Sequence, residues 1–265
     1  YFMSLSSSLS LLLLLLINFF IVYIYMTSNN VVFKMKNFSN LILQNEKVIV
    51  FDMDETLGHF VQIGSLCNLL EIYFKKKINQ TEFNKIMDLY PEILRPNILS
   101  LLEYIKIQKM KLKCSKVIIY TNNQGPKEWA LKIGKYLNYK LGFKLFDQVI
   151  GSKFNEPCRT THRKTFSDLK KCANLPNNVR VCFIDDLYHR DMDKQHIQYI
   201  MVEPYVVGIP NNLLIQRLYS SNIFIIYNRY SFINFINNKM DNYRTGNFNI
   251  KNNNFLYQNV VSFLN

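Results

Sequence analysis

The sequence predicts an α/β protein in which a central, mainly parallel β-sheet lies between layers of helices, as in three-layer Rossmann-like folds. Short apolar runs rich in Val, Ile and Phe recur along the chain, which is typical of strands buried on both faces of a parallel sheet. Between these runs, apolar residues recur at the spacing of amphipathic helices. The chain has 265 residues, of which 49% are hydrophobic and 19% charged, so a wholly disordered or collagen-like chain is excluded.

Strands and helices are expected to alternate from residue 47 onward. The strands are expected at residues 47–51, 116–120, 146–150, 179–184 and 199–202. The helices are expected around residues 65–76, 81–90, 98–105, 126–142, 166–169 and 213–218. Pro126 suits a first helical turn, Gly142 suits a helix end, and Trp129 is expected to pack the helix between them on the sheet. The two helices between the first strand and Arg95 predict a flap or small cap inserted at that point.

Composition divides the chain into a hydrophobic N-terminal segment (residues 1–40), an α/β domain (41–220) and an Asn- and Tyr-rich C-terminal extension (221–265). Residues 9–26 are almost uninterruptedly apolar, and as a helix they would measure about 27 Å, close to the thickness of a bilayer core. Lysines follow this run and none precedes it, so a membrane-spanning helix would leave the domain on the cytoplasmic side. Two interpretations stay open: a membrane anchor, or translated upstream sequence ahead of a start at Met26.

Charge and cysteine usage bound the partners and the compartment. Lys and Arg number 32 against 19 Asp and Glu, a net charge of +13 that favours anionic partners without predicting specific nucleic-acid binding. The cysteines are odd in number and form no C-x-x-C pair: Cys67, Cys114, Cys158, Cys172 and Cys182. This usage predicts free thiols in a reducing compartment rather than a disulfide framework or a zinc site. We expect a cytoplasmic or nuclear protein, or a catalytic domain anchored on the cytoplasmic face of a membrane.

Polar side chains follow three of the expected strands. Asp52 and Asp54 follow the first, Thr121 follows the second, and Asp185 and Asp186 follow the strand at 179–184. Ligands of open α/β sheets bind beyond the carboxyl ends of the strands, so these residues are expected to converge. Four carboxylates in one small volume repel one another unless a cation intervenes, and Mg²⁺ prefers such oxygen ligands. Alternation along an extended chain points Asp52 and Asp54 the same way, so that one can attack phosphorus while the other handles a proton.

At this point the sequence resembles the haloacid dehalogenase superfamily of aspartate-nucleophile phosphatases. The signatures occur in order: Asp52-x-Asp54-x-Thr56, then Thr121, a lysine, and Asp185-Asp186. The Asp-Glu-Thr-Leu wording of the first signature, together with Arg95-Pro96, resembles one branch in particular. That branch comprises the phosphatases of the RNA polymerase II C-terminal domain, also called nuclear LIM interactor-interacting factor-like phosphatases.

The resemblance implies a role for each matching residue. Asp52 would be the nucleophile and a magnesium ligand, and Asp54 the general acid and base, with its backbone carbonyl also on the metal. Thr121 would hydrogen-bond a phosphoryl oxygen, while Asp185, supported by Asp186, would complete the magnesium site. Thr56 and the neighbours of Thr121 are candidate substrate-binding residues: Thr56, Asn122 and Asn123.

The lysine signature and the substrate leave alternatives open. Lys164 has the expected position at the start of a helix, although it lies 185 − 164 = 21 residues ahead of Asp185; Lys170 is closer but inside the helix. The favoured function is magnesium-dependent hydrolysis of phosphoserine or phosphothreonine in a phosphoprotein. A phosphatase for small metabolites or nucleic-acid ends is a second hypothesis, and a catalytically silent, membrane-associated binding module is a third. Because Asp52, Asp54 and Asp185 are all present, the enzyme is favoured over the silent module.

Overall fold

The computed structural model describes residues 46–240 and 253–265 of the chain. Its sheet has five strands: β1 (Lys47–Phe51), β2 (Lys116–Tyr120), β3 (Gln148–Ile150), β4 (Arg180–Asp185) and β5 (Ile197–Met201). Their order is β3-β2-β1-β4-β5 and every neighbouring pair is parallel. The predicted α/β class is therefore confirmed, and the strand predictions agree with the structure to within a few residues.

The central position of β1 follows from its sequence, because each residue after Lys47 is apolar and buried. Val50 pairs with Ile118 of β2 on one side and with Phe183 of β4 on the other. Such a strand has no face for water and is stable only between two neighbours. The carboxyl ends of β2, β1 and β4 consequently lie side by side, and these are the strands that polar residues follow.

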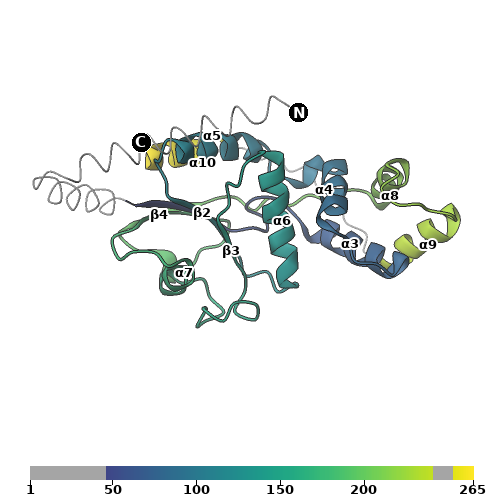
Figure 1. The fold of residues 1–265 in the computed structure, drawn as a ribbon, viewed down its shortest axis with the longest axis horizontal. Coiled ribbons are helices and arrows are strands. Elements are labelled where there is room, and N and C mark those ends of the chain that lie inside the picture. The colour runs from purple at the N-terminus through teal and green to yellow at the C-terminus, as the bar shows by residue number, and fades with distance from the viewer. Residues whose placement is uncertain (1–45, 241–252) are drawn as a thin grey trace, which may run out of the picture. The chain divides into compact units, whose positions relative to one another are not determined.

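Helices cover both faces of the sheet. They are α3 (Val61–Phe74), α4 (Gln80–Leu89), α5 (Ile98–Met110), α6 (Lys127–Lys140), α7 (Phe166–Ala173), α8 (Asn211–Ser220), α9 (Arg229–Lys239) and α10 (Asn253–Leu264), with single 3₁₀ turns at Pro91–Ile93 and Arg190–Met192. Val48 and Val50 belong to the apolar cluster that includes Leu169 of α7, whereas Ile49 and Phe51 belong to the larger cluster formed with α5 and α6. Figure 1 shows α7 on one side of the strands and α5 and α10 on the other. The alternation of side chains along a strand thus separates two cores.

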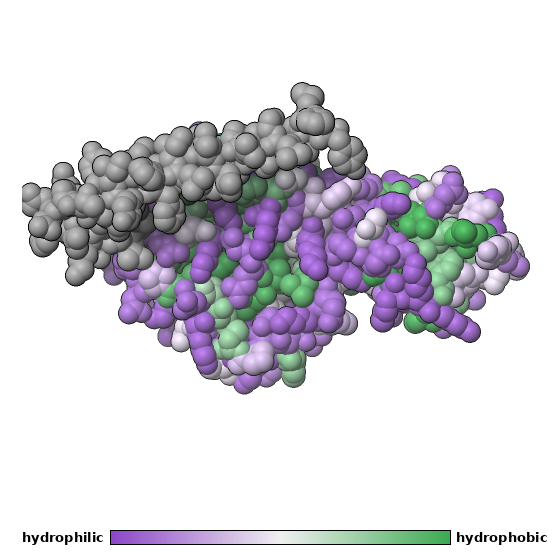
Figure 2. All heavy atoms as spheres, in the orientation of Figure 1, coloured by the Kyte–Doolittle hydropathy of each residue, from purple (hydrophilic) through white to green (hydrophobic). Residues whose placement is uncertain are grey.

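The predicted insertion between the first strand and Arg95 is present as α3 and α4. Its helices pack onto later parts of the chain: Tyr73 of α3 lies 5.1 Å from Phe232 of α9, ring centroid to ring centroid. Phe74 stacks on Phe224 at 4.8 Å, in the connection between α8 and α9. On the face drawn in Figure 2, hydrophobic residues gather near α8 and α9. Aromatic packing therefore fastens the insertion to the C-terminal helices.

The structure places Trp129 between α6 and the insertion, whereas the sequence assigned it to the interface with the sheet. Its ring meets Phe83 of α4 edge-on at a centroid distance of 5.5 Å. A Cβ atom at Gly64 of α3 would lie only 3.3 Å from Cζ2 of Trp129, so glycine permits this close approach. Gly142, with φ of +55°, follows α6 in the left-handed region, as the sequence predicts for a helix end.

The cysteines depart from the sequence-based prediction that none is disulfide-bonded. Cys158 and Cys172 form a disulfide, with their Cα atoms 5.3 Å apart, while the other three cysteines are buried free thiols. The prediction is wrong because it relied on local spacing. The pair closes only when α7 turns back beside the loop that precedes it, which sequence spacing alone does not indicate.

No helix among residues 46–240 and 253–265 is both long enough and apolar enough to cross a membrane. The span predicted at residues 9–26 lies outside the described residues.

Candidate active site

The carboxyl ends of β1 and β4 bring two aspartates onto one buried lysine. Asp52 follows β1, and its backbone N–H donates to the carbonyl of Ile184 at 2.8 Å; Asp185 is the last residue of β4. Lys164 reaches them from the loop before α7. Its Nζ donates to Oδ2 of Asp185 at 2.7 Å and to Oδ1 of Asp52. Residues separated by 112 and 21 positions are thus joined in one ion-paired cluster.

The surroundings of Lys164 make it a fixed cation. The side chain is buried, 2% exposed, and its Nζ lies 5.9 Å from the ring centroid of Phe183. Burial alone would lower the pKa of Lys164, but the charges and hydrogen bonds of Asp52 and Asp185 raise it above its usual value. Lys170, the other candidate, donates instead to Oδ1 of Asn177 at 2.7 Å, on the exposed part of α7. The structure brings Lys164, not Lys170, to the aspartates.

Three carboxylates of this edge could hold a metal ion. Asp52, Asp185 and Asp186 each offer an oxygen within 4.8 Å of the others. Hard oxygen donors in this number suit a divalent cation that keeps some of its water ligands. Lys164 balances only one of the three negative charges, so a further cation would relieve the remaining repulsion. The donor set therefore fits the metal site that the sequence predicts, although the carboxylate of Asp54 lies outside this group of three.

Burial acts to raise the pKa of both aspartates bonded to Lys164, but their polar partners leave the two pKa values shifted in opposite directions. Burial, opposed by Lys164 and reinforced by Asp185, raises the pKa of Asp52 to about 7. Burial also acts on Asp185, but His189, whose Nε2 lies 3.4 Å from Oδ2 of Asp185, together with Lys164 holds the pKa of Asp185 below its usual value. Asp185 therefore favours its ionised form more than a free aspartate does, whereas Asp52 takes up a proton more readily than a free aspartate.

Asp54 is held differently and has an oxygen to spare. Asn123 donates through Nδ2 to Oδ2 of Asp54 at 2.8 Å. Its other oxygen, Oδ1, is buried and has no hydrogen-bond partner among the described residues. Burial raises the pKa of Asp54 to about 6, against the hydrogen bond from Asn123. A carboxyl group with such a pKa can give and take a proton near neutral pH.

The segment that joins Asp52 and Asp54 to the next element is fixed through its backbone. Glu55 has a φ of +55°, in the left-handed region, where the chain turns out of the sheet. Arg95, 3% exposed, donates 2.6 Å hydrogen bonds to the carbonyl oxygens of Glu55, Thr56 and Glu203. A buried guanidinium with three carbonyl partners offsets the cost of holding this turn. In the sequence, Arg95 contributed only to the family resemblance, and no structural role was predicted for it.

The hydroxyl of Thr56 is bonded to Asp186. Thr56 Oγ1 donates to Oδ1 of Asp186 at 3.0 Å and accepts from the backbone N–H of Asp186 at 3.1 Å. Of the residues after β2, Thr121 is buried, and its Oγ1 accepts from the N–H of Asn123 at 3.0 Å. Oδ1 of Asn122 accepts from Arg159 at 2.9 Å. The structure therefore places all of the predicted site residues at this edge of the sheet, with several of their polar atoms already hydrogen-bonded.

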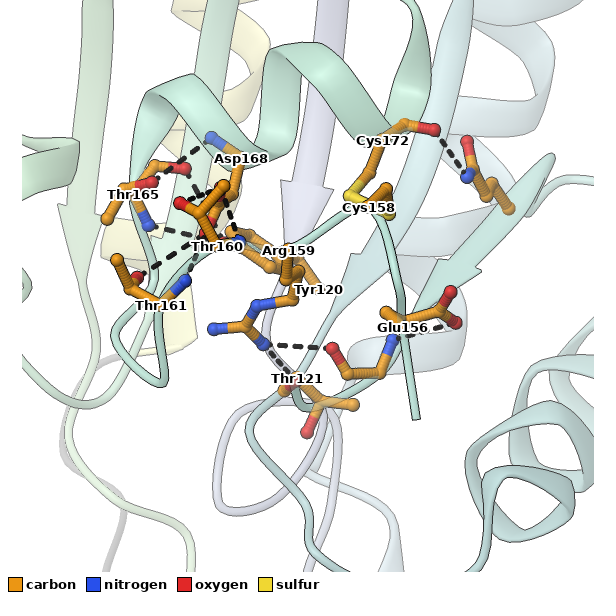
Figure 3. The surroundings of a disulfide bond; sticks show 12 residues. Tyr120, Thr121, Glu156, Cys158, Arg159, Thr160, Thr161, Thr165, Asp168 and Cys172 are labelled. Atoms are coloured by element: carbon orange, nitrogen blue, oxygen red, sulfur yellow. Dashed lines mark hydrogen bonds between the residues drawn. A yellow bond between two sulfur atoms is a disulfide. The ribbon is translucent and has the colours of Figure 1, made fainter. Parts of the chain in front are cut away.

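Arg159 is a residue of the site that the sequence analysis missed. It is 3% exposed and donates through Nη1 to the carbonyl oxygens of Thr121, at 3.2 Å, and Gly151, at 2.8 Å. Figure 3 shows its guanidinium reaching the Thr121 segment from the loop after β3. No motif marks this arginine in the sequence, because it acts through its reach to a segment 38 residues away.

The first turn of α7 anchors the loop that carries Lys164. Thr165 caps the helix, its Oγ1 accepting from the N–H of Asp168 at 3.1 Å. The carboxylate of Asp168, which is fully buried, accepts from the N–H and Oγ1 of Thr160, at 2.9 and 2.8 Å, and from the N–H of Thr161 at 3.2 Å (Figure 3). Burial would raise the pKa of Asp168, but these hydrogen bonds hold it below its usual value.

Comparison with known proteins gives one family and one solved structure. Residues 47–225 match the family model described as NLI interacting factor-like phosphatase. A beta-phosphoglucomutase from Thermotoga maritima is similar at 15% identity over 72% of this chain and 99% of the other, with a TM-score of 0.35, which is too low to bear on function. No curated protein is significantly similar to this chain.

Asp168→Asn is expected to destabilise the protein in a way that depends on pH. At neutral pH an amide accepts fewer of the hydrogen bonds from Thr160 and Thr161, and we expect a loss of about 1–3 kcal/mol. Because folding lowers the pKa of Asp168, its contribution is present above the unfolded pKa, about 3.9, and is lost as the pH falls through the lower folded value. Urea unfolding at pH 7 and at pH 3.5 measures the difference between variant and wild type, which should narrow at the lower pH. Asp191→Asn, which changes an exposed carboxylate, is the control, and an equal loss in both variants would contradict this account.

Proposed function

This chain belongs to the NLI interacting factor-like phosphatase family, and on that premise we propose that it is a magnesium-dependent phosphatase that works through an aspartyl-phosphate intermediate. Its proposed substrates are phosphoserine and phosphothreonine in proteins. The observation that carries the chemistry is the position of Asp52 and Lys164 beside Asp185 at the carboxyl edge of the sheet.

The proposed first step is the transfer of the phosphoryl group to Asp52. One oxygen of Asp52 is bonded to Lys164, which leaves the other for attack on phosphorus. As the ester bond breaks, Asp54 gives its proton to the departing alcohol; its raised pKa, about 6, supports this role. Lys164 and the hydroxyl of Thr121 are proposed to compensate charge on the phosphoryl oxygens. Mg²⁺ held by Asp52, Asp185 and Asp186 would supply further charge stabilisation.

The proposed second step returns the enzyme to its starting state. Asp54, now ionised, accepts a proton from the water that attacks the aspartyl-phosphate. The bond between phosphorus and Asp52 breaks, inorganic phosphate leaves, and the carboxylate of Asp52 is regenerated. Dividing one difficult displacement between two easier ones is the advantage of covalent catalysis. The hydrogen bond from Asn123 supports the dual role of Asp54 because it orients one oxygen and leaves Oδ1 free for the proton.

Protein substrates are favoured by the family and by charge. The first signature and Arg95-Pro96 resemble the branch that acts on the RNA polymerase II C-terminal domain, which is a protein substrate. The net charge of +13 suits phosphorylated, acidic partners. The insertion formed by α3 and α4 follows directly on the Asp52–Asp54 segment, where it can shape what approaches the site.

Asp52→Asn tests the nucleophile. With the full chain, Mg²⁺ and para-nitrophenyl phosphate, we expect turnover to fall on the order of 10³-fold or more, because the amide cannot attack phosphorus. Chelation of divalent metal should abolish wild-type turnover, and added Mg²⁺ should restore it. Asp191→Asn is the control and should keep wild-type activity. Hydrolysis that survives in Asp52→Asn would exclude the aspartyl-phosphate route.

Lys164→Ala and Lys170→Ala distinguish the two lysines of the sequence analysis. Removal of Lys164 leaves Asp52 and Asp185 without their buried cation, and kcat is expected to fall on the order of 10²-fold. Lys170 lies on the exposed part of α7, so its variant should stay within about twofold of wild type. Steady-state kinetics measure both, and circular dichroism verifies that each variant is folded. A larger fall in kcat for Lys170→Ala than for Lys164→Ala would show that Lys170 is the lysine of the family signature.

A substrate panel tests the protein specificity. Purified full-length chain with Mg²⁺ is offered phosphoserine and phosphothreonine peptides, nucleotides, 5′-phosphorylated oligonucleotides and sugar phosphates at equal concentration. We expect kcat/KM for the peptides to exceed that for the other classes by about tenfold or more, which corresponds to roughly 1.4 kcal/mol of transition-state discrimination. Preference for sugar phosphates or nucleic-acid ends would overturn the protein-substrate proposal and leave the chemistry intact.

A further inference from the structure

The loop between β3 and α7 controls two sides of the site at once. Near its end, Lys164 donates hydrogen bonds to Asp52 and Asp185. In its middle, Arg159 donates a hydrogen bond to the carbonyl oxygen of Thr121, directly after β2. Because the loop has no regular secondary structure, its shape depends on side-chain bonds rather than on a backbone ladder. Whatever holds Arg159 in place therefore also positions the lysine.

Arg159 ties the loop to the segment after β2. Besides its bonds to Thr121 and Gly151, it donates through Nη2 to Oδ1 of Asn122 at 2.9 Å. The same nitrogen donates to the carbonyl oxygens of His162, at 3.2 Å, and Arg163, at 2.9 Å, directly ahead of Lys164. The guanidinium also lies over the ring of Tyr120, 4.8 Å from its centroid.

The residue before Arg159 is covalently fixed. Cys158 is bonded to Cys172 in the last turn of α7, as Figure 3 shows, and the bond closes a ring of chain that contains Arg159, Lys164 and Asp168. Breaking the bond would leave the Arg159 end of the loop held by hydrogen bonds alone. A ring of this length loses much of its constraint when it opens, because the free chain gains conformational entropy.

The two cysteines of the disulfide are less buried than the three free cysteines. Cys158 and Cys172 are half-buried, whereas Cys67, Cys114 and Cys182 are buried. Burial raises the pKa of Cys67 to about 12 and that of Cys114 to about 11, which suppresses their thiolates at neutral pH. Because Cys67, Cys114 and Cys182 are free thiols, the Cys158–Cys172 bond is the one that a dithiol reductant can reduce among the described residues.

We propose that the Cys158–Cys172 disulfide is a redox control on the active site, acting through Arg159 as a positioning residue for Lys164 and Thr121. The proposal rests on the proposed function and adds its regulation. A dithiol reductant supplies two electrons and two protons: the bond between the sulfurs of Cys158 and Cys172 breaks, both become thiols, and the reductant becomes a disulfide. Because thiol–disulfide exchange is reversible, such a bond can be opened by a dithiol and closed again by an oxidant.

The first experiment compares oxidised and reduced wild-type full-length chain. Mass spectrometry after alkylation establishes whether Cys158 and Cys172 are paired, and para-nitrophenyl phosphate with Mg²⁺ reports turnover. On reduction we expect kcat to fall by about tenfold to a hundredfold with a smaller change in KM, because displaced groups cost rate even where substrate still binds. Reoxidation should restore kcat. Circular dichroism at the assay temperature verifies that the reduced protein is folded.

A double variant provides the matched control. Cys158→Ser combined with Cys172→Ser cannot form the bond, so its kcat should equal that of reduced wild type and should not respond to the dithiol. If the dithiol lowers kcat of this variant as much as it lowers kcat of the wild type, another group is responsible for the change in kcat and the proposal is overturned. Failure of the sulfurs of Cys158 and Cys172 to pair under oxidising conditions would also overturn it.

Arg159 variants test the positioning role. Arg159→Ala should lower kcat as reduction does and should make it insensitive to the redox state, because the group through which the disulfide acts is gone. Arg159→Lys retains the charge without the planar fork and should recover part of kcat. Full dithiol sensitivity in a folded Arg159→Ala protein would exclude Arg159 as the link.

Hydrogen exchange separates this inference from the proposed function. If the oxidised chain hydrolyses no phosphate ester, the proposed function fails, and amide exchange of the segment 158–165 still decides the redox coupling. Faster exchange of this segment on reduction supports the proposal. Equal exchange in the two redox states, or equal kcat in an active protein, contradicts it.

Discussion

The structure depends on a buried lysine that lies between two aspartates. Asp52 and Asp185 come from adjacent strands, and their burial at the sheet edge would be unfavourable without a cation between them. Lys164 provides that cation, but it enters from outside the sheet on a loop that has no ladder of its own. The loop must therefore be fixed as firmly as the strands are, because otherwise Lys164 would not stay within hydrogen-bond distance of Asp52 and Asp185.

Two separate sets of contacts meet that requirement. Asp168 collects backbone and hydroxyl donors from Thr160 and Thr161, and this fixes the loop against the first turn of α7. Arg159 and the Cys158 disulfide fix its other side, against the segment after β2 and the end of the same helix. The carboxylates at the strand ends have other partners: Asp186 accepts from Thr56, Asp54 accepts from Asn123, and Asp52 and Asp185 accept from Lys164. Backbone carbonyls and the side chains of Arg159 and Asp168 carry most of the positioning of the loop, and Oδ1 of Asp54 has no hydrogen-bond partner among the described residues.

The C-terminal helices extend the fold beyond the part matched by the family. That part ends at residue 225, between α8 and α9. The helix α9 packs through Phe232 on Tyr73 of α3, and α10 lies beside β5, where the carbonyl of Asn259 accepts from Gln198 at 3.1 Å. Tyr257 of α10 also contacts Tyr104 of α5 at a centroid distance of 5.3 Å. These helices complete apolar surfaces of the insertion and of the sheet layer, which gives the matched part additional packing.

The sequence alone determined the parallel α/β class, nearly all strand positions and the aspartates at the strand ends, because each depends on local apolar runs and on polar residues directly after them. It favoured Lys164 but left Lys170 open, and it predicted no disulfide at Cys158 and Cys172. It gave no role to Arg159. Those features were decided by the tertiary structure, since they require segments tens of residues apart to meet at defined distances. Local propensity and spacing do not predict such long-range contacts. They are determined by the burial of charge and by the path of the loop between β3 and α7.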